Sequence, residues 1–280
     1  MTIQTPLDRY VNASGIRTRY WSIGDHGPVI ILLHGLGASA EIWLHNIDAL
    51  AKNHTVLVPD LAGFGRSEKP ASSFSPVDYA VFIDNFMAAL NIKHASLIGQ
   101  SLGGGVVLLY ALRYPQKIEK LVLVDCAGFG QEVIWTLRLM SLPWIGEIIS
   151  YPSRMGVSLF FKLAVRNPEV ITEEFVDKYY TLFNQPGFQA FLLKITRILV
   201  DFWGAKKELL APVLGGLHKI KRPTLIIWGE NDRVFPVKHA YFGKEKMPNA
   251  QLYIMNQCGH IPNLERPDEF NRVVLDFFAR

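Results

Sequence analysis

The sequence predicts an α/β protein with a mostly parallel sheet that is covered by helices on both faces. Short apolar runs bounded by Gly, Pro or Asp recur along the chain, and helix-like segments lie between most of them. The runs are apolar without alternation, which is typical of strands buried on both faces. The chain has 280 residues, of which 49% are hydrophobic and 19% charged, so it can bury an extensive core. Repeated strand, helix, strand units therefore predict a doubly covered parallel sheet.

The expected elements follow one another along the chain. β-type alternation across 8–23 is broken at Asn12 and Ser14-Gly15, which predicts an N-terminal hairpin. Six buried strands are expected at 29–33, 56–58, 96–98, 121–124, 225–228 and 252–255, which gives an eight-stranded sheet with the hairpin. Helices are expected at 41–52, 76–90, 102–113, 237–247 and 265–279.

This rhythm breaks after Asp125, because the next strand-like run begins only at Thr224. The intervening segment has aromatic and aliphatic residues at helical spacing, punctuated by several prolines and by Gly215-Gly216. We therefore expect a core domain formed by 1–128 and 218–280, interrupted by an inserted helical cap domain at 129–217.

The strongest local signal for chemistry is the sequence Gly-Gln-Ser-Leu-Gly at 99–103. It directly follows an expected strand and directly precedes an expected helix. A G-x-S-x-G pattern in this position is typical of a nucleophile elbow, in which a strained turn projects the serine hydroxyl at the helix N-terminus. The pattern predicts that Ser101 is a nucleophile.

A serine hydroxyl needs a base near neutral pH, and the base needs an anionic group that orients it. Asp232 and His260 follow two later strands, at the sheet edge where such partners belong. The order Ser101, Asp232, His260 is the hydrolase-type order. Glu230 and Asp125 compete with Asp232 for the orienting role, because each also follows an expected strand.

Four linked motifs carry a resemblance to a known family. They are His-Gly-Leu-Gly at 34–37, Asp-Leu-Ala-Gly-Phe-Gly-Arg-Ser at 60–67, the Ser101 elbow, and the loops of Asp232 and His260. Residues 20–280 resemble the α/β-hydrolase superfamily, in its cap-bearing branch of serine esterases and carbon–carbon bond hydrolases. The resemblance implies Ser101 as nucleophile, His260 as general base and acid, Asp232 as orienter, and an oxyanion hole formed by the backbone N–H groups of Leu36 and Leu102.

The resemblance leaves the reaction open among several classes. We expect a serine hydrolase that cleaves carboxylic esters of small to medium apolar substrates. Carbon–carbon bond hydrolysis of meta-cleavage products and lactone hydrolysis are the enzymatic alternatives. A hydrolase-fold receptor with little turnover and a cofactor-independent oxygenase are the alternatives of other classes. The carbon–carbon hydrolases typically have Asn before the serine and an aromatic residue after the histidine, where this chain has Gln100 and Ile261.

The expected cap supplies many aromatic and aliphatic side chains, some of which must face the active-site crevice. We predict that Trp135, Leu139 and Trp144 bind the substrate together with Gln100 and Ile261. An acidic substrate would need an inward-pointing basic residue of the cap, and the candidates are Arg138, Arg154, Lys162, Arg166, Lys194 and Arg197.

Charge and cysteine content limit the binding partners and the cellular location that we expect. The formal net charge of +4 is spread along the chain, which does not suggest nucleic-acid binding. Cys126 and Cys258 are too few for a disulfide framework and do not have metal-ligand spacing. No signal peptide or segment long enough to span a bilayer is evident. We expect a cytoplasmic monomer or homodimer that binds a small apolar ester and uses no metal or organic cofactor.

Overall fold

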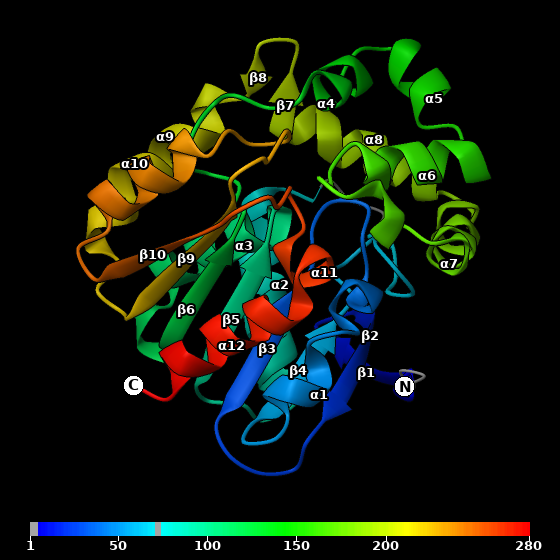
Figure 1. Cartoon of the computed structure of the whole chain (residues 1–280). Coiled ribbons are helices and arrows are strands. Elements are labelled where there is room, and N and C mark those ends of the chain that lie inside the picture. Colours follow the sequence, from blue (N-terminus) through cyan, green and yellow to red (C-terminus); the bar gives the residue numbers. More distant parts are fainter. Residues whose placement is uncertain (1–4, 71–73) are drawn as a thin grey trace.

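A computed structural model describes residues 5–70 and 74–280 (Figure 1). Its eight-stranded sheet has the strand order β1-β2-β4-β3-β5-β6-β9-β10. The strands are β1 (Arg9–Ala13), β2 (Ile16–Ile23), β3 (Val29–Leu33), β4 (Thr55–Pro59), β5 (Ala95–Gln100), β6 (Ile118–Val124), β9 (Thr224–Gly229) and β10 (Ala250–Met255). The first hairpin and the pairing of β2 with β4 are antiparallel, and all other pairs in this sheet are parallel. The predicted α/β fold with an eight-stranded, mostly parallel sheet is confirmed.

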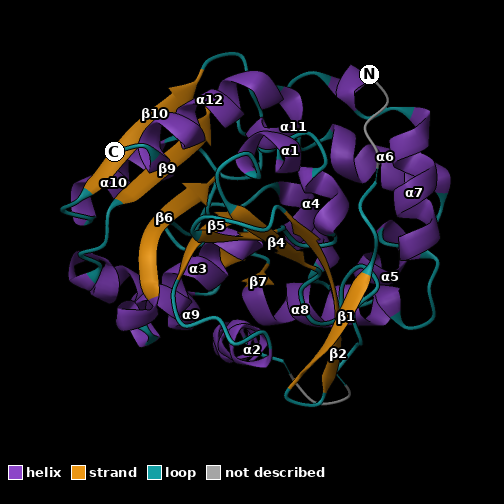
Figure 2. Ribbon diagram, turned by 90° about the horizontal axis from the view of Figure 1, so that it is seen from below, coloured by secondary structure: helices purple, strands orange, loops and turns teal. Residues whose placement is uncertain are grey.

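Helices lie on both faces of this sheet (Figure 2). The short α1 packs against α12, while α2 packs against α3 across the sheet from them. The helices of this part of the chain are α1 (Ile47–Leu50), α2 (Pro76–Ala89), α3 (Leu102–Arg113), α9 (Lys207–Gly216), α10 (Lys238–Lys246), α11 (Pro262–Glu265) and α12 (Pro267–Phe278). Local signals explain where α2 begins, because Ser75 and Asp78 form a capping box and Pro76 occupies the first turn.

The single helix predicted at 41–52 was wrong, because this segment is a 3-10 turn at Ala40–Trp43 followed by α1. The helix predicted at 265–279 corresponds to α12, which the separate short helix α11 precedes. Trp43 is fully buried, and it packs beside Phe270 of α12 with ring centroids 6.0 Å apart. Burial of this side chain from a tight turn, rather than helical propensity, sets the path of the chain there.

The five helices that follow β6 lie above the strand ends (Figure 1). They are α4 (Trp135–Met140), α5 (Ile145–Ile149), α6 (Arg154–Lys162), α7 (Glu173–Phe183) and α8 (Phe188–Leu199). A two-stranded hairpin of β7 (Val200–Asp201) and β8 (Gly204–Ala205) lies between α8 and α9. The sequence pattern indicated only helices in this segment and did not predict the hairpin. We call the inserted segment 129–217 the cap; α9 is its last helix and also packs against α3 of the sheet layer. These limits remain our proposal for the domain boundaries.

An ion network buried within the chain joins the N-terminal hairpin to the loop after β4. The guanidinium of Arg19 in β2 is fully buried and lies 3.0 Å from a Glu41 oxygen and 3.1 Å from Asp60 Oδ1. Asp60 also accepts the backbone N–H groups of Ala40 and Arg66. The network fixes the loops beside the sheet edge at which the site lies. No helix in the described ranges is both long and apolar enough to cross a bilayer.

Candidate active site

The turn at Ser101 joins β5 to α3 in a strained conformation. Ser101 has φ of +53°, which is rare for a residue with a side chain, and it is the N-cap of α3. The glycines on both sides permit this turn. A Cβ at Gly99 would lie 2.3 Å from the carbonyl oxygen of Gly103, and a Cβ at Gly103 would lie 2.4 Å from that of Leu33. The turn places the Ser101 hydroxyl above the ends of β3 and β5.

The structure brings Ser101, His260 and Asp232 into one hydrogen-bonded chain. Ser101 Oγ lies 2.9 Å from His260 Nε2, and His260 Nδ1 lies 2.8 Å from Asp232 Oδ2. The other oxygen of Asp232 accepts the backbone N–H groups of Val234 and Phe235, at 2.7 and 3.0 Å. Because Asp232 can only accept at Oδ2, Nδ1 of His260 carries the hydrogen and Nε2 is free to take the serine proton.

His260 is also held through its backbone. Its N–H donates to the carbonyl oxygen of Ala164, which follows α6 of the cap, at 2.8 Å. Its carbonyl oxygen accepts from the Gln100 side chain at 2.9 Å. Gln100, the residue before the nucleophile, therefore links the elbow to the histidine loop. The sequence predicted Gln100 at the site but not this bridging contact.

The predicted oxyanion donors flank the serine. Leu102 is the first residue of α3, so its N–H group has no acceptor within the helix. The loop that carries Leu36 passes close to the elbow, because a Cβ at Gly35 would lie 3.0 Å from Ser101 Cβ. The role of these two amides in binding an oxyanion stays a prediction.

His34 has a structural role beside this loop. It is fully buried, its Nε2 accepts the backbone N–H of Leu61 at 2.9 Å, and its Nδ1 lies 2.8 Å from the Gly35 carbonyl oxygen. Nδ1 must therefore carry the hydrogen of a neutral imidazole. Burial lowers the pKa of His34 to about 4, because imidazolium formation would cost both solvation and the bond to Leu61.

The site has a cavity with two lobes, which meet at Ser101. The first lobe lies between the elbow and cap helices α4 to α8, and Ser101, His260, Gln100 and Ile261 line it. The second lobe extends along α3 toward α9. Both lobes share Ser101, Leu36 and Leu137. A substrate can therefore extend from Ser101 in two directions.

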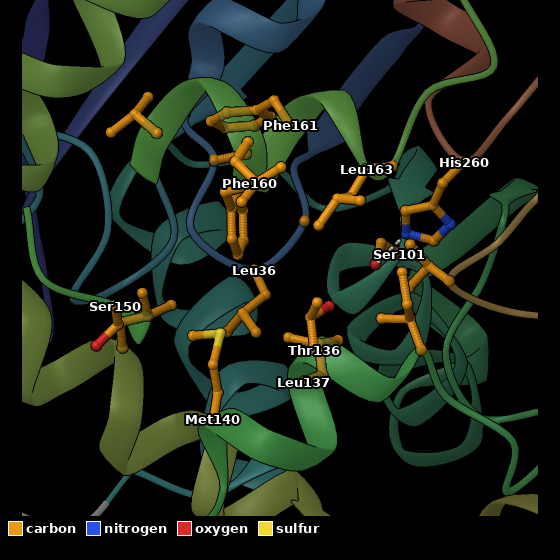
Figure 3. A pocket seen from close by; sticks show the side chains of 18 of the residues that line it. Leu36, Ser101, Thr136, Leu137, Met140, Ser150, Phe160, Phe161, Leu163 and His260 are labelled. Atoms are coloured by element: carbon orange, nitrogen blue, oxygen red, sulfur yellow. Dashed lines mark hydrogen bonds between the residues drawn. The ribbon is translucent and has the colours of Figure 1, made fainter. Parts of the chain in front are cut away.

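The structure does not bring three of the predicted substrate-binding residues to this cavity. Trp135 and Trp144 are 58% and 81% exposed, and neither they nor Leu139 line either lobe. Trp144 lies at the N-cap of α5 with φ of +68°, and this backbone turn leaves its ring at the surface. Thr136, Leu137 and Met140 of α4 line the first lobe instead (Figure 3).

Charged groups are scarce in the cavity lining. In the described part of the chain, no Asp, Glu, Lys or Arg lines the first lobe, and Lys206 alone does so in the second. The six basic cap residues that could have bound an acidic substrate line neither lobe. Arg197, for example, lies 2.9 Å from Glu147 on the outside of the cap.

Comparison with known proteins identifies a family that is consistent with the elbow at Ser101 and with the sheet topology. The model of the α/β hydrolase fold family matches residues 28–151 and 165–267. The chain belongs to the α/β hydrolase fold family.

Three relatives of this α/β hydrolase have named activities. A 2-hydroxy-6-oxo-6-phenylhexa-2,4-dienoate hydrolase from Burkholderia cepacia is 28% identical over 96% of this chain and 94% of its own. The structure of a meta-cleavage product hydrolase from Pseudomonas fluorescens IP01 is 29% identical over 97% of each chain, with a TM-score of 0.83. A bacterial membrane phospholipase A is 25% identical over 98% of this chain and 86% of its own, with a TM-score of 0.78.

The α/β hydrolase has one further acidic group beside the site. Single ligand atoms of Asp125, Asp232 and His260 all lie within 4.8 Å of one another, and all three residues are buried. Such a set could approach a metal ion, but His260 Nδ1 and Asp232 Oδ2 are already bonded to each other. A cation between them would replace the bond that orients the histidine toward Ser101. The sequence indicated Asp125 only as a competitor of Asp232 and not as its neighbour.

Proposed function

We propose that this chain is a serine hydrolase that cleaves carboxylic esters of apolar substrates through an acyl-enzyme on Ser101. One observation carries the proposal: Ser101 Oγ lies 2.9 Å from His260 Nε2 at the edge of a cavity lobe whose lining, within the described residues, has no Asp, Glu, Lys or Arg. The hydrogen-bonded chain supports an activated serine, and the lining supports an uncharged acyl group.

The proposed reaction has two halves. Ser101 Oγ attacks the ester carbonyl carbon while its proton passes to His260 Nε2, and the N–H groups of Leu36 and Leu102 donate to the oxyanion as it forms. His260 then protonates the leaving alcohol, and the carbon–oxygen bond breaks. In the second half, His260 takes a proton from water, the resulting hydroxide attacks the acyl-enzyme, and Ser101 regains its proton as the acid leaves.

The two lobes fit the two parts of an ester. Because both lobes reach Ser101, one can hold the acyl chain while the other holds the alcohol. Leu137 and Met140 of α4 and Phe160 of α6 supply apolar contacts in the first lobe (Figure 3). Burial of substrate methylenes against such side chains stabilises the complex by about 0.8 kcal/mol each.

Carbon–carbon bond hydrolysis is the second candidate, and the names of the relatives favour it over ester hydrolysis. Two of the three relatives described above are hydrolases of meta-cleavage products. Such dienoates carry a carboxylate, which needs a cationic or hydrogen-bonding partner when buried. Among the described residues, Lys206 is the basic side chain that lines the second lobe, whereas the first lobe offers, besides His260, neutral donors such as Thr136 and Ser150.

A direct substrate comparison decides between the two reactions. We would measure kcat/KM for p-nitrophenyl butyrate and for 2-hydroxy-6-oxo-6-phenylhexa-2,4-dienoate with the same enzyme preparation, using Ser101→Ala as the blank. Ester cleavage with the higher kcat/KM supports the proposal. A dienoate kcat/KM that exceeds the ester value assigns carbon–carbon hydrolysis instead, and Lys206→Met should then lower it while leaving ester cleavage unchanged.

A further inference from the structure

The most unusual group outside the hydrogen-bonded chain of Ser101, His260 and Asp232 is Asp125. It directly follows β6 with φ of +42°, a strained value for a residue with a side chain, and it is fully buried. Its Oδ1 accepts the backbone N–H of Gly229 at 3.0 Å. Its Oδ2 is buried and has no hydrogen-bond donor among the described residues. An ionised carboxylate with one bare, buried oxygen is costly.

The neighbouring carboxyl group is much better supplied with donors. Asp232 accepts from the backbone of Val234, from the backbone of Phe235 and from His260 Nδ1. Asp125 has one donor, and both groups lie within 4.8 Å of His260. Two adjacent buried carboxylates repel each other, so one of them keeps its proton. The negative charge therefore belongs on Asp232, and the proton belongs on the poorly solvated Asp125.

We propose that Asp125 is a positioning residue, a protonated carboxylic acid whose Oδ2–H donates a hydrogen bond to Asp232. The proton satisfies the otherwise bare Oδ2 and removes the repulsion between the two carboxyl groups. It also gives the Asp232 carboxylate a further donor that fixes its orientation toward His260. The pair then carries a single negative charge, located where it faces the imidazole. No bond is made or broken at Asp125 during turnover.

The other groups around Asp125 favour the same protonation state. Asp232 and Glu265 are acidic, burial raises the pKa of the Cys126 and Cys258 thiols so that they stay neutral, and His260 is bonded to Asp232. Burial, followed by the charge of Asp232, raises the pKa of Asp125 well above its ordinary value. The single backbone donor from Gly229 opposes this shift. Burial and the neighbouring carboxylate thus both favour the protonated form of Asp125.

Two substitutions separate a donated hydrogen bond from a negative charge. Asp125→Asn keeps an acceptor for Gly229 and a donor for Asp232, so it should retain kcat within about threefold. Asp125→Ala removes the donor and should lower kcat by about tenfold with little change in KM. Asp276→Asn, an exposed position on α12, is the matched control for replacing an aspartate by asparagine.

The pH dependence of kcat/KM distinguishes a positioning role of Asp125 from a purely structural one, because loss of a purely structural contact would not shift it. If Asp125 is neutral, Asp125→Asn leaves the acid limb of kcat/KM at the wild-type pH. If Asp125 is ionised, its loss removes a negative charge near His260, and the limb moves to lower pH. Such a shift, or equal kcat in Asp125→Ala and wild type, would overturn the proposal.

The turnover tests rest on the proposed function, so the deciding experiment needs no substrate. Infrared difference spectra between wild type and Asp125→Asn at neutral pH report the C=O stretch of a protonated carboxyl group. We expect this band in the wild type and its loss in the variant. A difference spectrum that shows only ionised carboxylate bands contradicts the proposal, even if no ester is ever turned over and even if Asp125→Ala does not fold.

Discussion

The hydrogen bonds of single side chains decide what the candidate site can do. Asp232 Oδ2 fixes which nitrogen of His260 carries the hydrogen, and Nε2 is thereby presented to Ser101. Sequence order and strand ends predicted Ser101, His260 and, as the preferred orienter, Asp232. They left Asp125 as a competitor of Asp232, because both follow strands that end at the same edge. The backbone donors of Val234 and Phe235 distinguish them, and such contacts have no local sequence signal.

Asp232→Asn tests the orienting role directly. An asparagine presents N–H where the carboxylate accepts, which favours the wrong imidazole tautomer, so ester turnover should fall by roughly 10³ to 10⁴. Circular dichroism before the assay checks that the fold is retained. Turnover close to wild type would transfer the orienting role to Asp125 or Glu230.

Ser101 and His260 should behave as one unit. Ser101→Ala and His260→Ala are each expected to lower kcat by several orders of magnitude, because proton transfer and attack belong to one step. The double variant should lose little more than either single variant. Losses that add in the logarithm would show that the two residues do not share a mechanism.

His34 should make stability depend on pH. The unfolded histidine has its ordinary pKa near 6.5, and burial lowers the folded value to about 4. Between these values the unfolded state binds the proton and the folded state does not, so the contribution is complete above about pH 6.5 and is lost as the pH falls toward 4. The free energy of unfolding should fall by about 3 kcal/mol more in wild type than in His34→Gln over that window. Urea titrations of the two proteins at pH 7 and pH 4.5 measure this difference. An equal fall in the free energy of unfolding in wild type and His34→Gln would contradict the role of His34.

Elements that are buried on both faces were the easiest to predict. β3, with the sequence Val-Ile-Ile-Leu-Leu, needs no tertiary information to be recognised as a central strand. Short elements such as α1, α5 and the β7–β8 hairpin depend on packing, which local propensity does not encode. The sequence likewise could not show which face of a cap helix points toward the cavity. On α4, Trp135 faces solvent and Met140 is buried, although both are apolar.

Arg19 should be the main stabilising contact between β2 and the loops beside it. Arg19→Met removes the buried cation, so Glu41 is left with its pair with Arg66 and Asp60 is left with its backbone donors. This loss should lower the free energy of unfolding by about 3 kcal/mol. Arg154→Met removes exposed pairs with Glu173 and Asp177 and should cost at most about 1 kcal/mol. Equal losses in the two variants would show that the buried network contributes no more than a surface ion pair.

The inward face of α4 can be tested with two residues of the same segment. Met140→Ala removes apolar contact from the first lobe and should lower kcat/KM for an octanoate ester several-fold. Trp144→Ala, at an exposed position outside the lining, should leave kcat/KM unchanged within about twofold. The opposite pattern would mean that the cap rearranges when substrate binds.

At the scale of the whole molecule, the cap and the sheet edge enclose a largely apolar cavity that ends against α4 to α8. Affinity should therefore rise with each methylene until the chain reaches the cap. We expect kcat/KM for p-nitrophenyl esters to peak at acyl chains of about four to eight carbons, with a carboxylated analogue among the poorest substrates. A maximum at palmitate, or a preference for the carboxylated analogue, would contradict an apolar cavity that ends at the cap.

The central claim is that Ser101 is an activated nucleophile, and its reaction with a fluorophosphonate tests this most directly. Intact-mass spectrometry after treatment should show one adduct, which peptide mapping places on Ser101, and none on Ser101→Ala. Asp232→Asn should react much more slowly, because His260 would no longer be held in the tautomer that accepts the serine proton. An unmodified wild-type protein, or an adduct that persists in Ser101→Ala, would contradict the account.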